Sequence, residues 1–168
     1  EEWAELVIGA YSVYPADSST TCGDNCADVY GNLYNWYALD DIRGICPDAW
    51  HIPSDEEWTI LTDYLGGNDT AGHKMRECTA GSCPESDYWN SPSDETTNES
   101  GFTALPGGYR SSKYTLNFGS LGIRSFFWSS SEEDSTSAWA RKLYDYQSLV
   151  HMGNASKKYG YSIRCLHD

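Results

Sequence analysis

Six cysteines constrain the fold of this chain more than any other feature of its sequence. They fall into two close couples and one distant couple: Cys22 and Cys26, Cys78 and Cys83, and Cys46 and Cys165. The two close spacings differ from the C-x2-C pairs of zinc ribbons. The most economical pairing closes each close couple as a local loop and joins the distant couple, although six cysteines allow many other pairings. Cysteine use of this kind indicates a disulfide-stapled protein of an oxidising compartment, either secreted or displayed on the cell surface.

The strong negative charge of the chain argues against several classes of partner. With 25 acidic and 11 basic residues, the formal net charge is −14, whereas nucleic-acid binding requires clustered Lys and Arg. The same charge disfavours docking on anionic membranes. No apolar stretch is long enough to cross a bilayer, so we expect no direct membrane insertion. The chain begins at Glu1 without an initiator Met or a signal peptide, so we expect a segment of a longer precursor.

Helical signals lie in the first half of the sequence. Apolar residues at helical spacing predict a first helix over residues 31–41. A capping box from Ser54 to Glu57, followed by an apolar periodic run, predicts a second helix over residues 54–65. Residues 68–101 are polar and rich in turn formers, which predicts a long loop region.

Strand signals dominate the second half, where the apolar period changes to two. Strands are predicted at residues 102–106, 126–131, 137–144, 147–152 and 160–167, with turns at 106–108, 132–134 and 153–154. A strand that ends at Pro53 is also expected after Cys46. Helices followed by a strand-rich half are typical of an α+β domain, and the absence of repeats or linkers favours a single domain over residues 1–168.

Five segments, in this order, resemble the "major paralogous domain" family first described from Fibrobacter. They are residues 30–37 (YGNLYNWY), 44–58 (GICPDAWHIPSDEEW), 100–110 (SGFTALPGGYR), 127–132 (FWSSSE) and 160–165 (GYSIRC). The resemblance implies a C-type-lectin-like fold, in which two helices of the first half pack on a mostly antiparallel, twisted sheet of the second half. That fold is shared with formylglycine-generating enzymes and with the variable proteins of diversity-generating retroelements. The resemblance also implies an exported bacterial protein and strengthens the Cys46–Cys165 bridge, which would match the long disulfide of C-type lectins.

An aromatic and polar surface in the second half is the best candidate for ligand binding. Tyr and Asn supply rigid amphipathic contact area and adaptable hydrogen bonds, which suit a protein ligand or the rings of a sugar. Lectin-like folds commonly carry ligand contacts in this region, so the resemblance points to the same place. The alternative is that these are ordinary exposed strand and loop residues. The candidate ligand-binding residues are Tyr109, Tyr114, Asn117, Tyr144, Tyr146, Gln147, His151 and Asn154.

One acidic loop has the composition of a calcium site. Calcium takes several oxygen ligands in flexible geometry, and Asp94, Glu95, Asn98 and Glu99 place such oxygens along a flexible stretch. The alternative is a solvated acidic loop without metal. Calcium is the one cofactor that the sequence suggests.

Catalytic signals are weak. The four histidines share no metal-ligand spacing, no nucleophile elbow is present, and a packing role is expected for His51. Formylglycine-generating enzymes use a neighbouring cysteine pair for copper-dependent oxidation. Here the pair Cys78 and Cys83 lies in the mid-chain loop, far from the GYSIRC ending, which favours a structural disulfide.

These observations favour a non-catalytic extracellular binding or adhesion module whose ligand is a glycan or a protein. A structural subunit of a surface filament, which would self-associate, is the first alternative. A diverged oxidase of the formylglycine-generating type is the second.

Overall fold

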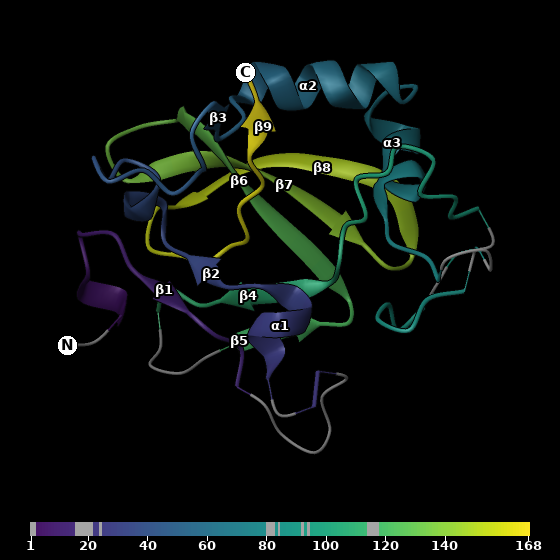
Figure 1. Ribbon diagram of the computed structural model, residues 1–168, viewed down its shortest axis with the longest axis horizontal. Coiled ribbons are helices and arrows are strands. Elements are labelled where there is room, and N and C mark those ends of the chain that lie inside the picture. The colour runs from purple at the N-terminus through teal and green to yellow at the C-terminus, as the bar shows by residue number, and fades with distance from the viewer. Residues whose placement is uncertain are drawn as a thin grey trace.

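The computed structural model describes residues 3–15, 22–23, 25–79, 83, 85–91, 93, 95–113 and 118–168. Within these ranges the chain is an α+β protein, with helices confined to the first half and the longest strands in the second (Figure 1). The helices are α1 (Cys26–Tyr30), α2 (Asp55–Tyr64) and α3 (Asn68–Met75), and single 3-10 turns lie at Trp3–Glu5 and Trp36–Ala38.

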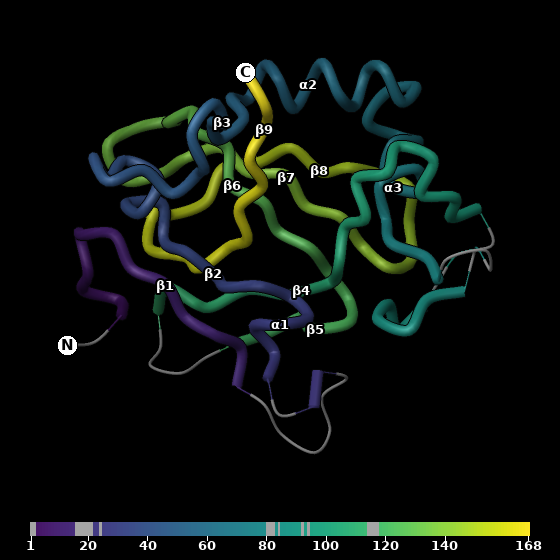
Figure 2. The backbone as a smooth tube through the Cα atoms, in the orientation of Figure 1, coloured from purple at the N-terminus to yellow at the C-terminus, as the bar shows by residue number. Residues whose placement is uncertain are grey.

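The central sheet consists of three long antiparallel strands in the order β6-β7-β8. They are β6 (Arg124–Glu132), β7 (Ser137–Tyr144) and β8 (Gln147–Ser156). Three two-stranded antiparallel ladders surround it: β1 (Tyr11–Ser12) with β2 (Leu33–Tyr34), β3 (Trp50–His51) with β9 (Leu166–His167), and β4 (Gly107–Arg110) with β5 (Phe118–Leu121). The tube in Figure 2 shows the last segment of the chain returning beside β3 at the N-terminal end of α2.

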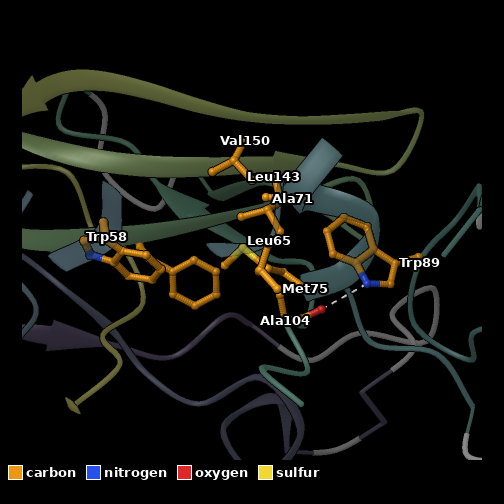
Figure 3. Packing of buried hydrophobic residues seen from close by; sticks show 9 residues of the cluster. Trp58, Leu65, Ala71, Met75, Trp89, Ala104, Leu143 and Val150 are labelled. Atoms are coloured by element: carbon orange, nitrogen blue, oxygen red, sulfur yellow. Dashed lines mark hydrogen bonds between the residues drawn. The ribbon is translucent and has the colours of Figure 1, made fainter. Parts of the chain in front are cut away.

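The two faces of the central sheet are covered by different parts of the chain. Side chains of β7 alternate between the faces. We call the side of Arg141 and Leu143 the helix face, because Leu143 belongs to the buried cluster that also contains Trp58 of α2 and Met75 of α3 (Figure 3). In the same core Trp89 donates its indole N–H to the carbonyl oxygen of Ala104 over 3.1 Å.

We call the opposite side the outer face. It carries Phe126 and Trp128 of β6, which pack with Trp36 and Tyr161. Tyr161 comes from the C-terminal segment, which forms an isolated bridge with Tyr34 and thereby covers this end of the face. The other end, next to the β7–β8 turn, carries the residues of the candidate site.

All six cysteines form the predicted pairs, Cys22–Cys26, Cys46–Cys165 and Cys78–Cys83. The Cys46–Cys165 bridge spans 119 residues. In the chain-entropy model such a closure stabilises the fold by about 5 kcal/mol. The bridge holds the C-terminal segment near α2, and together with the helix pair on an antiparallel sheet it is consistent with a C-type-lectin-like arrangement. Three disulfides are likewise consistent with an oxidising compartment.

The second predicted helix is confirmed, including its capping box. Ser54 accepts from the backbone N–H of Glu57, whose carboxylate accepts from the N–H of Ser54 over 2.8 Å. The strand that ends before Pro53 is confirmed as β3. The predicted strands at 126–131 and 137–144 correspond to β6 and β7, joined near the predicted turn at 132–134.

The helix predicted over residues 31–41 is wrong. Gly31 adopts a φ of 75°, and the following residues form β2 and a 3-10 turn instead. Tertiary contacts outweigh the local pattern. Asn35 is buried and bonds through its side chain to the backbone of Ala10 and Ile8, and the indole N–H of Trp36 reaches the carbonyl oxygen of Ser129.

Residues 68–101 are not a continuous loop, because α3 occupies their first part. The strand predicted at 102–106 is reduced to one bridge at Ala104, and the turn predicted at 106–108 lies where β4 begins. The turn predicted at 153–154 is wrong, since β8 runs through it. Of the strand predicted at 160–167, only isolated bridges and the short β9 form.

Candidate ligand-binding surface

The turn between β7 and β8 presents a cluster of three aromatic rings. Tyr144 ends β7, Tyr146 lies in the turn, and His151 lies on β8. The ring of Tyr144 contacts those of Tyr146 and His151 edge-on, with centroids 5.5 Å and 5.7 Å apart. Tyr146 is 64% exposed. We call Tyr144, Tyr146 and His151 the hairpin aromatic cluster; the paired strands hold it in a fixed geometry.

Two basic side chains lie beside this cluster on the outer face. The guanidinium of Arg124 lies over the ring of Tyr144, 5.0 Å from its centroid, and Tyr144 is its cross-strand partner. Lys142 is the cross-strand partner of both Phe126 and His151. Burial lowers the pKa of Lys142, and the positive charge of Arg124 lowers it further. The register of β6 and β7 places Arg124 and Lys142 diagonally on the same face, where the two positive charges repel each other.

Neither cation has a counter-charge within the part of the chain that the structure describes. The side chains of Arg124 and Lys142 form no ion pair and no hydrogen bond there, and the Nε of Arg124 is buried without a partner. Asp145 follows Tyr144 directly but belongs to the other side, where Arg76 donates to its carbonyl oxygen over 2.5 Å. This end of the outer face is therefore locally positive on a strongly acidic protein.

Tyr109 lies deeper than the cluster. Its ring stands edge-on to Phe126 and Tyr159, at 5.4 Å and 6.0 Å between centroids. Tyr159 stacks on Tyr161, whose phenol pKa is raised by burial and by the neighbouring tyrosines Tyr159, Tyr109 and Tyr144. Tyr109 thus packs with Phe126, Tyr159 and Tyr161 on the outer face, and no ring contact among the described residues joins it to the hairpin aromatic cluster.

The remaining predicted ligand residues divide into three groups. Gln147 is the cross-strand partner of Tyr144 and lies within the site. Asn154 pairs with Trp139 and is separated from His151 by an odd number of positions, so its side chain points to the opposite face of the sheet. Tyr114 and Asn117 lie outside the described residues.

The predicted calcium loop is docked on α3 through a carboxylate–imidazole contact, in which burial lowers the pKa of His73, and through one ion pair. Glu95 contacts the Nδ1 of His73 at 2.9 Å, and Glu99 contacts the Nζ of Lys74 at 3.0 Å. The Asn98 side chain bonds to Thr103, and Asp94 lies outside the described residues. No group of three or more His, Cys, Asp or Glu residues in the described ranges is placed to hold a metal ion. A calcium ion bound here would have to displace the Glu95–His73 contact and the Glu99–Lys74 ion pair, which the sequence did not reveal.

His51 has a role that sequence reasoning missed. The expected packing role is wrong, because the imidazole is partly exposed and bridges two carboxylates, Asp168 at 2.6 Å and Glu57 at 2.9 Å. Hydrogen bonds to Asp168 and then to Glu57 raise the pKa of His51. The bridge borders a groove of about 680 Å³ that is also lined by Trp50 and Ile60. The capping role of Glu57 was the one available signal that a carboxylate stands beside this imidazole.

The protein is therefore a disulfide-stapled α+β domain, with three disulfides and an aromatic, basic surface at one hairpin. The comparisons with known proteins make it more specific. The chain belongs to the Fibrobacter succinogenes major domain family, whose model it matches over residues 4–167. No curated protein and no solved structure matches it. None of the helices in the described residues is long and apolar enough to span a membrane.

Proposed function

We propose that this chain is a non-catalytic binding or adhesion module of an extracellular or cell-surface protein. Its ligand is a glycan or a protein, bound by the hairpin aromatic cluster and Gln147. The observation that carries the proposal is the exposure of Tyr146 next to Tyr144 and His151 on a rigid hairpin.

Several physical arguments support a binding role for this cluster. Tyrosine offers a large apolar face and a polar hydroxyl with few rotatable bonds, so little conformational entropy is lost on binding. Anchoring on Arg124 and on the β7–β8 ladder limits that loss further. Tyr146 is 64% exposed and packs on Tyr144, so most of its ring is open to contact with a partner.

The proposal is tested on a glycan array, with and without calcium, with purified protein. We expect saturable binding that Tyr146→Ala reduces by about tenfold or more, since loss of an aromatic contact at the centre of a site commonly costs 1–2 kcal/mol or more. Tyr64→Ala is the matched control, because Tyr64 is 86% exposed on α2, away from the hairpin.

An unchanged affinity in Tyr146→Ala would move the site elsewhere. A blank array would direct the search to protein ligands. Calcium dependence would instead favour the loop around Glu95 and Glu99.

A structural role in a filament is the second candidate, and one observation favours it. The arm before β2 exposes Val7, Ile8 and Tyr11, at 65%, 64% and 63% of their full surface. Tyr11 belongs to β1, which pairs with β2 in a two-stranded ladder, and an exposed strand edge can recruit another chain. Light scattering that shows oligomers growing with concentration, and reverting to monomer in Ile8→Asp, would support this role. A strict monomer would remove it.

The oxidase alternative depends on free thiols that bind copper. All six cysteines are paired in disulfides. Thiol labelling of the unreduced protein tests this directly. Absence of labelling would remove the oxidase alternative, and a reactive pair at Cys78 and Cys83 would restore it.

A further inference from the structure

We infer that the outer-face surface selects ligands that carry an anionic group, and that its ligand is an acidic saccharide bearing a carboxylate or a sulfate. This inference rests on the proposed function and specifies its ligand class. The two residues that carry it are Arg124 and Lys142, neither of which the sequence singled out.

The first argument is that no carboxylate of the described residues neutralises Arg124 or Lys142. Arg141 and Lys157 are basic, buried and paired with carboxylates, Asp55 and Glu132 respectively. Arg124 and Lys142 instead stand next to each other on adjacent strands, and no described carboxylate lies within ion-pair distance of either. Two partly buried cations repel each other at short range, and an anion between them would relieve this repulsion.

The second argument is the arrangement of the aromatic groups around the cations. Arg124 is held over Tyr144, which fixes the guanidinium. Lys142 faces the exposed imidazole of His151 across the strand pair. A saccharide ring could stack on Tyr146 while its charged substituent reaches Arg124 and Lys142. Guanidinium groups bind carboxylate and sulfate oxygens well because their N–H groups form a planar fork.

The third argument is that the net negative charge of the protein repels an anionic ligand, so that binding of an anion depends on the local cations. The net charge of −14 repels anions at long range, so non-specific binding of an acidic saccharide is disfavoured. At physiological ionic strength this repulsion is screened beyond roughly 8 Å, whereas contacts within the site are not. Selectivity for an anion must therefore come from local groups, which makes it sensitive to single substitutions.

The test compares charged and neutral forms of the same saccharide by isothermal titration calorimetry. One arm uses trigalacturonate and its methyl ester, and the other uses a sulfated disaccharide and its unsulfated parent. We expect at least one charged form to bind about tenfold or more tightly than its neutral form, as expected for charge-assisted hydrogen bonds. The arm that shows the difference identifies the anionic group.

Four variants locate the effect. Lys142→Gln should weaken the charged form by about tenfold and leave the neutral form unchanged. Arg124→Gln should weaken the charged form more than the neutral form, because Arg124 also anchors the ring of Tyr144. Tyr146→Ala should weaken both forms. Arg43→Gln is the matched control for loss of one positive charge, because Arg43 is 81% exposed and pairs with Asp41 in a loop remote from β7 in the sequence.

The outcomes separate this inference from the proposed function. Equal binding of charged and neutral forms, lost in Tyr146→Ala, would overturn the inference and leave the binding module intact. Binding of neither form, together with neutral glycans or proteins bound through Tyr146, would do the same. A charge preference that persists in both Gln variants would also overturn it.

Discussion

Two neighbouring residues of β7, Arg141 and Lys142, point to opposite faces of the central sheet and meet opposite electrostatic conditions. Arg141 is 1% exposed on the helix face, where it pairs with the carboxylate of Asp55 and donates to the Asp55 carbonyl oxygen over 2.9 Å and to Thr59 over 3.2 Å. Lys142 lies on the outer face beside Arg124 and has no such partner among the described residues. On the helix face a buried cation is neutralised and secures the fold. On the outer face a partly buried cation is left without a carboxylate partner among the described residues.

The largest effect on stability is expected from the helix face. Arg141→Leu should lower the free energy of unfolding by about 2–3 kcal/mol, because it leaves Asp55 without its partner; a full buried pair would cost more, but Asp55 keeps some solvent contact. Urea denaturation followed by tryptophan fluorescence measures the change. Lys142→Gln is the matched control and should change stability by no more than about 0.5 kcal/mol. Equal losses in the two variants would show that the faces do not differ in this way.

Gly72 and Gly153 allow the helix face and the outer face to be compared by steric packing alone. A Cβ on Gly72 of α3 would lie 2.4 Å from the carbonyl oxygen of Ser148 on β8, a clash with rigid backbone. A Cβ on Gly153, on the outer face, would meet only the Nζ of Lys142, at 3.6 Å.

Gly72→Ala should therefore destabilise the protein by about 1–3 kcal/mol despite the better helix propensity of alanine. Gly153→Ala should change stability by about 0.5 kcal/mol or less, measured in the same denaturation experiment. A neutral Gly72→Ala would mean that α3 can move away from β8 without cost.

The close approach at Gly72 also shows why the sequence did not reveal α3. Its buried residues include Ala71, Gly72 and His73, which are small or polar and give no apolar period. By contrast, α2 has a capping box and an apolar stripe, both of which lie within its own sequence, and its position was predicted within one residue. A helix can be predicted when its cap and its apolar stripe are visible in its own sequence. A helix that depends on small residues packing closely against a sheet cannot be predicted in this way.

The candidate site also has one part that could be predicted from the sequence and one part that could not. The exposed aromatic residues could be predicted from the sequence, since Tyr144 and Tyr146 lie where two strands of alternating pattern meet. The cations could not, because Arg124 and Lys142 meet only through the pairing of β6 with β7. Register also decided against Asn154, which lies on the same strand as His151 but on the other face.

Removal of one outer-face cation should affect ligand binding without affecting the fold. Lys142→Gln relieves the repulsion with Arg124, so we expect a melting temperature equal to or slightly above that of the parent protein, measured by differential scanning calorimetry. Arg141→Gln on the helix face should lower it by several degrees. A lower melting temperature in Lys142→Gln would indicate that an unrecognised partner holds Lys142 in place.

The smallest effect is expected at the bridge of His51, where the participating side chains are partly exposed and salt screens them. Because Asp168 and Glu57 raise the pKa of His51 in the folded protein, the unfolded state loses this proton first as pH rises. The contribution of the bridge is therefore fully present below the unfolded pKa of about 6.5 and is lost as pH rises through the higher folded value.

Urea denaturation at several pH values across this window, at low and at high salt, measures the contribution. In the parent protein the free energy of unfolding should decline as pH rises between the unfolded and the folded pKa of His51. His51→Gln should abolish this decline, and Asp168→Asn should make it smaller. Glu57 contributes with the opposite sign. Its pKa is lowered by the backbone N–H of Ser54, by His51 and by the Ser54 hydroxyl, so its part is lost only in acid, below the ordinary carboxyl range. A decline that is unchanged in His51→Gln would show that the bridge does not stabilise the fold, and would leave the β3–β9 ladder and the Cys46–Cys165 disulfide as the contacts that hold the end of the chain.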